Sequence, residues 1–285
     1  MSYHSIVCVK QVPDTANITA EAMKEDGTVN RGALPTIFNP EDLHALEAAL
    51  EVKERFGGTV TVLTMGPPKA ADVLRDSLFR GADRVILLTD RRAAGSDTLA
   101  TSYILSQAVK TVGDYDFVFC GRQAIDGDTA QVGPQMAEKL GITQVTYLEQ
   151  VVKLEGKKAT IRRNTGGGYE IVEGPLPLLC TVIDTANEPR PQAVTRLMEL
   201  KKARVPSEVE EGDLAELEKK GRLLEQWDLD KINGDPERCG LSGSPTKVNR
   251  IQAIVLTKEG HTDVEPTDEG IRGMVSELIK DKTIG

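Results

Sequence analysis

Residues 117–140 read FVFCGRQAIDGDTAQVGPQMAEKL and contain the pattern that decides the fold. The apolar run FVFC predicts a short strand, a stretch of small and polar residues follows it, and residues 129–140 predict a helix. A strand without polar alternation is typical of a parallel sheet that is covered on both faces. The segment therefore predicts one strand–loop–helix unit of an α/β protein.

Similar units occur upstream of this segment. Strands are predicted at residues 5–10, 59–64 and 84–88, and helices at residues 39–57, 69–79 and 97–109. Asn39 is expected to cap the first of these helices, because Pro40 and two acidic residues follow it and suit the positive end of a helix. The alternation of strands and helices predicts a doubly wound, mostly parallel sheet.

The sequence changes character after Gly141. Four alternating segments, residues 145–154, 159–163, 169–172 and 178–182, predict an antiparallel excursion that returns to the main sheet. From residue 187 the chain is charged and broken by Pro and Gly, with one helix near residues 214–224 and an amphipathic helix at residues 267–282. We therefore expect the core to end at residue 186. The chain divides into an α/β domain, residues 1–186, and an extended arm, residues 187–285, that wraps a partner.

Composition excludes several classes of function. The 285 residues are 39% hydrophobic and 28% charged, as in a soluble globular protein. A formal net charge of −9 argues against a nucleic-acid partner, and no run of eighteen apolar residues predicts a membrane span. The N-terminal stretch MSYHSIVCVKQV is predicted to form a strand and not a signal peptide, so we expect a cytoplasmic location.

Cysteine and histidine residues predict neither a metal site nor a catalytic site. The four cysteines form no CxxC pair, and three of them lie in apolar runs where a free thiol behaves as a small hydrophobic residue. The three histidines are isolated from one another. Ser102 and Ser244 have no partner that the sequence assigns, so no nucleophile, acid or base set is predicted.

The loop at residues 121–133 is the first candidate binding site. Its small residues let backbone N–H groups approach an oxyanion, and a helix predicted to open at Thr129 would direct its positive end at a phosphate. The loop matches neither GxGxxG nor GxxxxGK[ST]. The alternative is an ordinary strand-to-helix turn that is capped by Asp128 or Thr129.

Residues 95–102, GSDTLATS, form a second candidate at another predicted helix start. Thr98 and Thr101 are three residues apart, so their hydroxyl groups can face one point above the helix start. The alternative is a simple cap by Ser96 or Asp97. Two such helix starts at one sheet edge could hold a pyrophosphate between them.

These motifs closely resemble the β subunit of electron transfer flavoproteins, over nearly the whole chain. The resemblance is carried by VCVKQVPDT at residues 7–15, FNP at 38–40, TMGPP at 64–68, CGRQAIDGDTAQVG at 120–133, NEPR at 187–190 and GSPT at 243–246. It implies an α/β domain of the adenine-nucleotide α-hydrolase-like type and an arm that wraps an α subunit. That α subunit holds an FAD of its own in the resulting heterodimer.

The resemblance also implies a set of nucleotide-binding residues. Adenosine would lie near Val9, Asn39, Asp42, Met65 and Gly66, with backbone groups of Val9 and Met65 at the adenine. The phosphates would lie over Gln123, Asp126, Gly127, Asp128, Thr129, Ala130, Gln131, Val132 and Gly133.

Residues 97–102, DTLATS, resemble the members of the family that bind a second FAD at this site and bifurcate electrons. In such members, Asp97, Thr98 and Thr101 would hold the second phosphate and the ribityl chain. NADH would be the electron donor. Ferredoxin or flavodoxin would be the low-potential acceptor, and an acyl-CoA dehydrogenase or a quinone-linked oxidoreductase the high-potential one.

Two other functions stay open at this point. One is an electron carrier without bifurcation, in which AMP is a structural ligand of the same loop. The other is a nucleotide-sensing regulatory protein of the same fold that has no redox chemistry.

Docking of partner dehydrogenases is implied at the start of the arm, by Glu188, Pro189, Arg190, Leu197 and Met198. The alternative for Leu197 and Met198 is packing against the α subunit.

Overall fold

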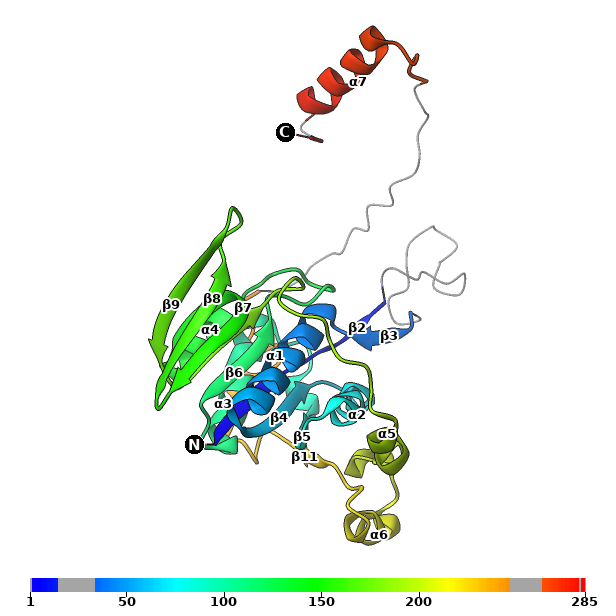
Figure 1. Ribbon diagram of the computed structural model, residues 1–285. Coiled ribbons are helices and arrows are strands. Elements are labelled where there is room, and N and C mark those ends of the chain that lie inside the picture. Colours follow the sequence, from blue (N-terminus) through cyan, green and yellow to red (C-terminus); the bar gives the residue numbers. More distant parts are fainter. Residues whose placement is uncertain (1, 15–33, 247–262, 282, 285) are drawn as a thin grey trace, which may run out of the picture.

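The computed structural model describes residues 2–14, 34–246, 263–281 and 283–284, and its main element is a nine-stranded sheet (Figure 1). The strands lie in the order β11-β5-β4-β1-β6-β10-β7-β8-β9. Their bounds are β1 Tyr3–Cys8, β4 Gly58–Met65, β5 Arg84–Leu88, β6 Phe117–Gly121, β7 Thr143–Glu155, β8 Lys158–Asn164, β9 Tyr169–Pro175, β10 Leu178–Val182 and β11 Glu225–Trp227. The predicted α/β class and the mostly parallel sheet are confirmed.

The order of the strands shows where a ligand site is expected. From β1 the chain moves outward to β4 and β5, and it then returns to place β6 on the other side of β1. All three neighbouring pairs β5–β4, β4–β1 and β1–β6 are parallel. Strand order therefore reverses at β1, and the crevice outside its carboxyl end is the position where doubly wound sheets bind ligands.

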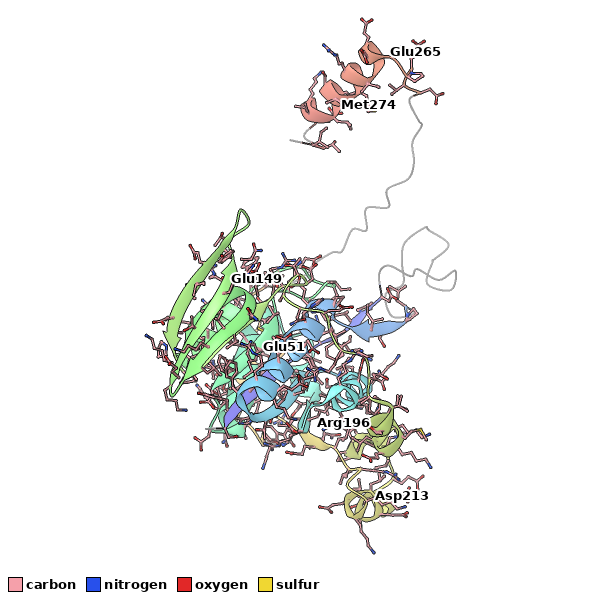
Figure 2. The ribbon with its side chains drawn as sticks, viewed as in Figure 1. Glu51, Glu149, Arg196, Asp213, Glu265 and Met274 are labelled. Carbon is pink, nitrogen blue, oxygen red and sulfur yellow. The ribbon has the colours of Figure 1, made fainter. Side chains whose placement is uncertain are left out.

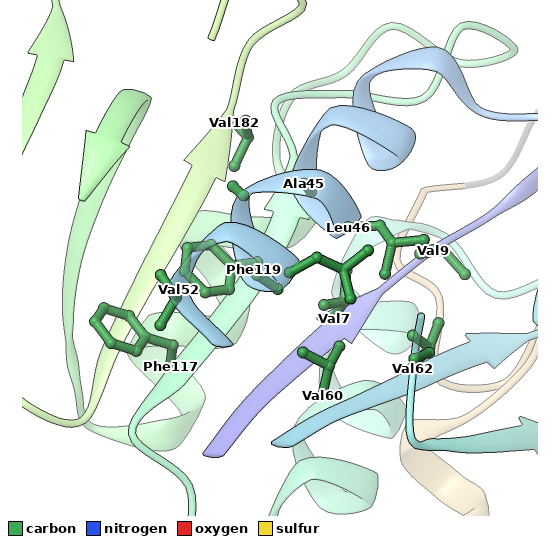
Figure 3. Packing of buried hydrophobic residues seen from close by; sticks show 14 of the residues in the cluster. Val7, Val9, Ala45, Leu46, Val52, Val60, Val62, Phe117, Phe119 and Val182 are labelled. Atoms are coloured by element: carbon green, nitrogen blue, oxygen red, sulfur yellow. The ribbon is translucent and has the colours of Figure 1, made fainter. Parts of the chain in front are cut away.

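Helices cover both faces of the parallel part of the sheet. α1 (Pro40–Phe56) and α2 (Ala71–Arg80) pack on one face, and α3 (Thr98–Val112) and α4 (Val132–Leu140) on the other. Alternate strand residues point to opposite faces, so Val7 and Phe119 contact the layer of α1 whereas Ile6 and Val118 contact that of α3 (Figure 3). The rings of Phe117 and Phe119 stack with centroids 5.2 Å apart beneath α1. Burial on both faces explains why the sequences of these strands are mainly apolar.

The antiparallel excursion is also confirmed. β7 pairs in parallel with β10, and β7–β8 and β8–β9 are antiparallel hairpins (Figure 1). A two-stranded sheet of β2 (Gln11–Pro13) and β3 (Thr36–Phe38) was not predicted. Thr15, at the end of the VKQVPDT motif, and His261 lie outside the described residues.

The expectation that the core ends at residue 186 is wrong, because β11 pairs in parallel with β5 and extends the sheet. Trp227 and Leu229 are buried in the same cluster as residues of α3. A three-residue strand inside a charged segment leaves no periodic pattern, so the sequence could not indicate it. The division into two domains at residues 186 and 187 stays a prediction.

Two predicted helices are shorter than expected. α4 begins at Val132 and not at residue 129, because Asp128 and Ala130 adopt φ values of 49° and 51° in the left-handed region, which a helix excludes. α6 covers only Leu214–Lys219, whereas α7 covers Asp268–Lys280 as predicted to within two residues. No helix of the described residues is long and apolar enough to cross a membrane.

The first part of the arm is fastened to the α/β domain. In α5 (Val194–Leu200), Nη1 of Arg196 donates to the carbonyl oxygens of Leu78 and Ala82, at 3.1 and 2.9 Å (Figure 2). The carbonyl of Leu78 lies in the last turn of α2, and that of Ala82 lies two residues beyond the end of the helix. α5 therefore packs on α2 as a continuation of the domain surface.

Candidate functional site

A cavity of about 350 Å³ opens at the carboxyl ends of β1, β4 and β6. All but two of the predicted nucleotide-binding residues line this cavity. Those that line it are Val9, Asp42, Met65, Asp97, Thr98, Thr101, Gln123, Asp126, Gly127, Asp128, Thr129, Ala130, Gln131, Val132 and Gly133. The exceptions are Asn39 and Gly66. The cavity lies at the point where strand order reverses, and its two walls come from the two loops that the sequence indicated.

The first wall is the loop that follows β6, residues 121–133, and Asn39 supports it from behind. Asn39 is fully buried, and the prediction that its side chain caps α1 is wrong, because that side chain makes no capping hydrogen bond. Its amide donates to the carbonyl of Gln123 at 2.9 Å and its side-chain oxygen accepts from the N–H of Ile125 at 3.1 Å. Asn39 is therefore a residue that shapes the loop rather than one that lines the cavity.

Two acidic residues at the start of α1 complete this support. Asp42 accepts from the N–H groups of Lys10 and Gly121, at 2.8 and 2.9 Å, so that one carboxylate joins the ends of β1 and β6. Glu41 accepts from the N–H of Gln123 at 3.0 Å and pairs with Arg122 at 2.6 Å. The resemblance implied Asp42 as a residue near the adenosine, whereas the sequence indicated Glu41 only as a favourable charge for the helix dipole, so Glu41 was missed as part of the site.

The second wall is the start of α3. Asp97 caps this helix, because its Oδ1 accepts from the N–H of Ala100 at 3.0 Å. Thr98 and Thr101 also line the cavity, so the capping and the binding interpretations of this motif are compatible. Oγ1 of Thr98 lies 2.9 Å from Oε1 of Gln131 and donates to it, which brings the two walls together at one point.

One acidic side chain of the first wall, that of Asp126, is paired with a cation, whereas the amide that donates to Asp128 is neutral. Nζ of Lys10 lies 2.7 Å from Oδ2 of Asp126, and Gln123 donates to Asp128 at 3.0 Å. Lys10 was missed in the sequence, although its place directly after a strand that ends at the site was an available signal. Backbone N–H groups and one lysine can therefore bind phosphate here.

Cys8 and Cys120 line the floor of the cavity, and both are buried. Burial and the nearby Asp42 carboxylate raise the pKa of Cys8 to about 12. Burial likewise raises the pKa of Cys120 well above the ordinary value. Both thiols are therefore protonated and unreactive, in agreement with their prediction as small hydrophobic residues.

Asp42 gives a testable dependence on pH. Burial raises its pKa from 3.8 to about 7. At a pH between these two pKa values, Asp42 of the folded protein holds a proton that the unfolded chain has released. The stabilisation that this proton provides is therefore complete below the pKa of the unfolded chain, and it is lost as pH rises towards 7. Relative to an Asp42→Asn variant, the free energy of unfolding of the wild type should fall by about 2–3 kcal/mol from about pH 5 to about pH 7.

The measurement is chemical unfolding of both proteins across this range. The Asn variant also loses one acceptor, because its amide N cannot accept from a backbone N–H, but that loss does not vary with pH. Parallel pH profiles of the two proteins would contradict the account.

Several predicted contacts are constrained by the fold. The N–H of Val9 donates to the carbonyl of Leu63, so an adenine contact there falls to the carbonyl of Val9. The N–H of Gly66 donates to the carbonyl of Leu88.

Among the predicted docking residues, Met198 is exposed and Leu197 is half-buried. Arg190 pairs with Glu47 of α1 at 2.8 Å.

No group of three or more His, Cys, Asp or Glu side chains in the described part of the chain could hold a metal ion. The ring of His4 contacts the carbonyl of Asp114 and the hydroxyl of Thr61, and the ring of His44 contacts Asn187. Both rings therefore have structural partners.

Comparisons with known proteins show the family of this chain. Residues 26–213 match the model of the electron transfer flavoprotein domain. The chain is 42% identical to the electron transfer flavoprotein subunit beta of Clostridium acetobutylicum, over 98% of this chain and 99% of that protein. It is 42% identical to protein FixA of Azorhizobium caulinodans, over 97% and 94% of the two chains. It is 40% identical to the caffeyl-CoA reductase-Etf complex subunit CarD of Acetobacterium woodii, over 98% of each. The chain therefore belongs to the electron transfer flavoprotein family, and it is of the β-subunit type.

Proposed function

We propose that this protein pairs with an electron transfer flavoprotein α subunit and binds FAD in the cavity between the two walls. The observation that carries the proposal is the pair of walls itself. A nucleoside monophosphate needs one anion-binding wall, which the loop at residues 121–133 supplies. The hydroxyl groups of Thr98 and Thr101 belong to a second wall, and that of Thr98 lies at hydrogen-bond distance from Gln131 of the first, as suits a pyrophosphate and a ribityl chain.

The residues of the site fit this ligand in their donor chemistry. N–H groups of residues 129–133 would bind one phosphate, because those of Gly127 and Asp128 already donate to the carbonyl of Ala124. Thr98 with Thr101 would bind the other phosphate and the ribityl end. The ammonium group of Lys10 lies at the rim and pairs with Asp126, so it would be shared between that carboxylate and a phosphate. When bound, FAD would supply hydride acceptance and one-electron transfer. The chain would hold and orient it without an acid or base of its own.

We further propose that the complex takes electrons from NADH and divides them between two acceptors in the cytoplasm. The low-potential acceptor would be ferredoxin or flavodoxin. The name of the Acetobacterium woodii relative includes a CoA-ester reductase complex. This supports an acyl-CoA dehydrogenase as the high-potential acceptor, ahead of a quinone-linked oxidoreductase.

The test is anaerobic mixing of the purified αβ complex with NADH and both acceptors. We expect NADH to be oxidised and the two acceptors to be reduced in equal electron amounts, with little reduction when either acceptor is left out. An electron carrier that holds structural AMP would instead leave NADH unused and accept electrons only from a reduced dehydrogenase.

A further inference from the structure

Residues 239–246, from the arm, pack against the second wall of the cavity, and we name them the clasp. Within the clasp, the hydroxyl of Ser244 accepts from the N–H of Asp97 at 2.8 Å. The N–H of Thr246 donates to Oδ2 of Asp97 at 3.0 Å. The N–H of Gly240 donates to the hydroxyl of Ser96 at 3.0 Å. Three hydrogen bonds thus join the clasp to two consecutive residues of the wall.

The clasp is itself closely packed. Ser244 is 3% exposed, and its hydroxyl donates to the carbonyl of Gly240 at 2.6 Å, so the same oxygen serves as donor and acceptor. Gly240, with φ of 58°, lies so close to the backbone before α3 that an added Cβ would be 2.3 Å from the carbonyl oxygen of Arg92 and 3.2 Å from that of Ala94. The arrangement therefore admits little variation in the position of the wall.

The two oxygens of Asp97 link the clasp to the ligand-facing residues. One oxygen caps the first turn of α3 through Ala100, and the other accepts from Thr246 of the clasp. Thr98, the next residue, lines the cavity and donates to Gln131 of the opposite wall. A shift of the clasp would therefore change the distance between Thr98 and the first wall.

We propose that the clasp sets the position of the second wall, and that Ser244 is a positioning residue for the larger nucleotide. The inference rests on the proposed FAD function for its ligand. Binding energies at linked sites are reciprocal, so a ligand that contacts Thr98 also stabilises the clasp.

The test compares Ser244→Ala with Ser77→Ala in the αβ complex. Ser77 is a matched control, because it is also fully buried and its hydroxyl donates to a carbonyl four residues earlier, at 2.7 Å in α2. Dissociation constants for FAD and AMP are measured on complexes stripped of nucleotide. Hydrogen exchange is measured at the amides of Ala100 and Thr101. Ser96→Ala serves as a second, milder variant.

We expect Ser244→Ala to weaken FAD binding about 10-fold, because one buried N–H loses its partner and the wall moves. AMP binding should change by less than about twofold, since the first wall alone holds a monophosphate. Exchange at Ala100 and Thr101 should become faster in Ser244→Ala, slower on addition of FAD, and unchanged in Ser77→Ala.

Unchanged FAD affinity and unchanged hydrogen exchange in Ser244→Ala would contradict the proposal that the clasp positions the second wall. If the wild type binds AMP and excludes FAD, the proposed function fails. The hydrogen-exchange data still decide whether the clasp positions the second wall. Faster exchange at Ala100 in Ser244→Ala would then support the clasp, and equal exchange would reject it. If Ser244→Ala does not fold, the same readouts in Ser96→Ala decide the question with a smaller expected change.

Discussion

Replacing both Thr98 and Thr101 with Val is expected to weaken FAD binding by the αβ complex at least about 100-fold. Each hydroxyl would donate to a phosphate or ribityl oxygen, that of Thr98 by turning its O–H away from Gln131. A hydrogen bond to a charged group contributes about 1.5–3 kcal/mol. Loss of two such bonds therefore corresponds to two or more orders of magnitude in the dissociation constant. Val has the shape of Thr without its hydroxyl, and both positions are half-buried, so folding should be little affected.

The control for this pair is Thr111→Val, at the other end of α3. Thr111 is also half-buried, and its hydroxyl donates to the carbonyl of Gln107 at 2.9 Å, far from the cavity in the chain. Dissociation constants for FAD and AMP are measured for both variants by equilibrium binding. Equal FAD affinity in the double variant and the control would mean that these hydroxyls do not bind the ligand.

Gly121→Ala is expected to lower both stability and nucleotide affinity. A Cβ at this position would lie 2.6 Å from Oδ1 of Asp42 and 2.7 Å from the backbone carbon of Glu41. Because both neighbours belong to the start of α1, the loop would have to move away from its support. We expect a loss of about 1–3 kcal/mol in the free energy of unfolding. Affinity for FAD and AMP alike should fall about 100-fold, since the N–H groups at the phosphates lose their positions.

Gly127→Ala is the control for stability, because a Cβ at Gly127 of the same loop meets no atom within 4 Å. Thermal unfolding midpoints and dissociation constants are measured for both variants. A Gly121→Ala protein that is as stable as Gly127→Ala would show that the contact between β6 and α1 does not fix the loop.

The sequence predicted the strands and the loops around the cavity wherever the signal was local. Apolar runs identified the strands, and the loops between them identified both walls, because a strand, a loop and a helix start are neighbours in the chain. The same reasoning misjudged the helix at Thr129, since the left-handed conformations of Asp128 and Ala130 depend on the surrounding contacts and not on a local pattern.

Contacts between distant segments could not be predicted in this way. Ser244 lies 147 residues from Asp97, and Glu41 lies 82 residues from Gln123, yet each pair shares a hydrogen bond that shapes the site. β11 was missed for a related reason, because Trp227 is buried only through pairing with a strand far earlier in the chain. Asn39, which the sequence predicted as a helix cap, and Ser244, for which it assigned no partner, both hold loops of the site in place.

The most direct test of the account is a nucleotide count on the purified αβ complex, with the cofactors released by acid and separated by chromatography. The account predicts two FAD and no AMP for each heterodimer, one FAD from each subunit. One FAD with one AMP would contradict it, and would identify the cavity as the site of a structural nucleotide in an electron carrier that does not bifurcate.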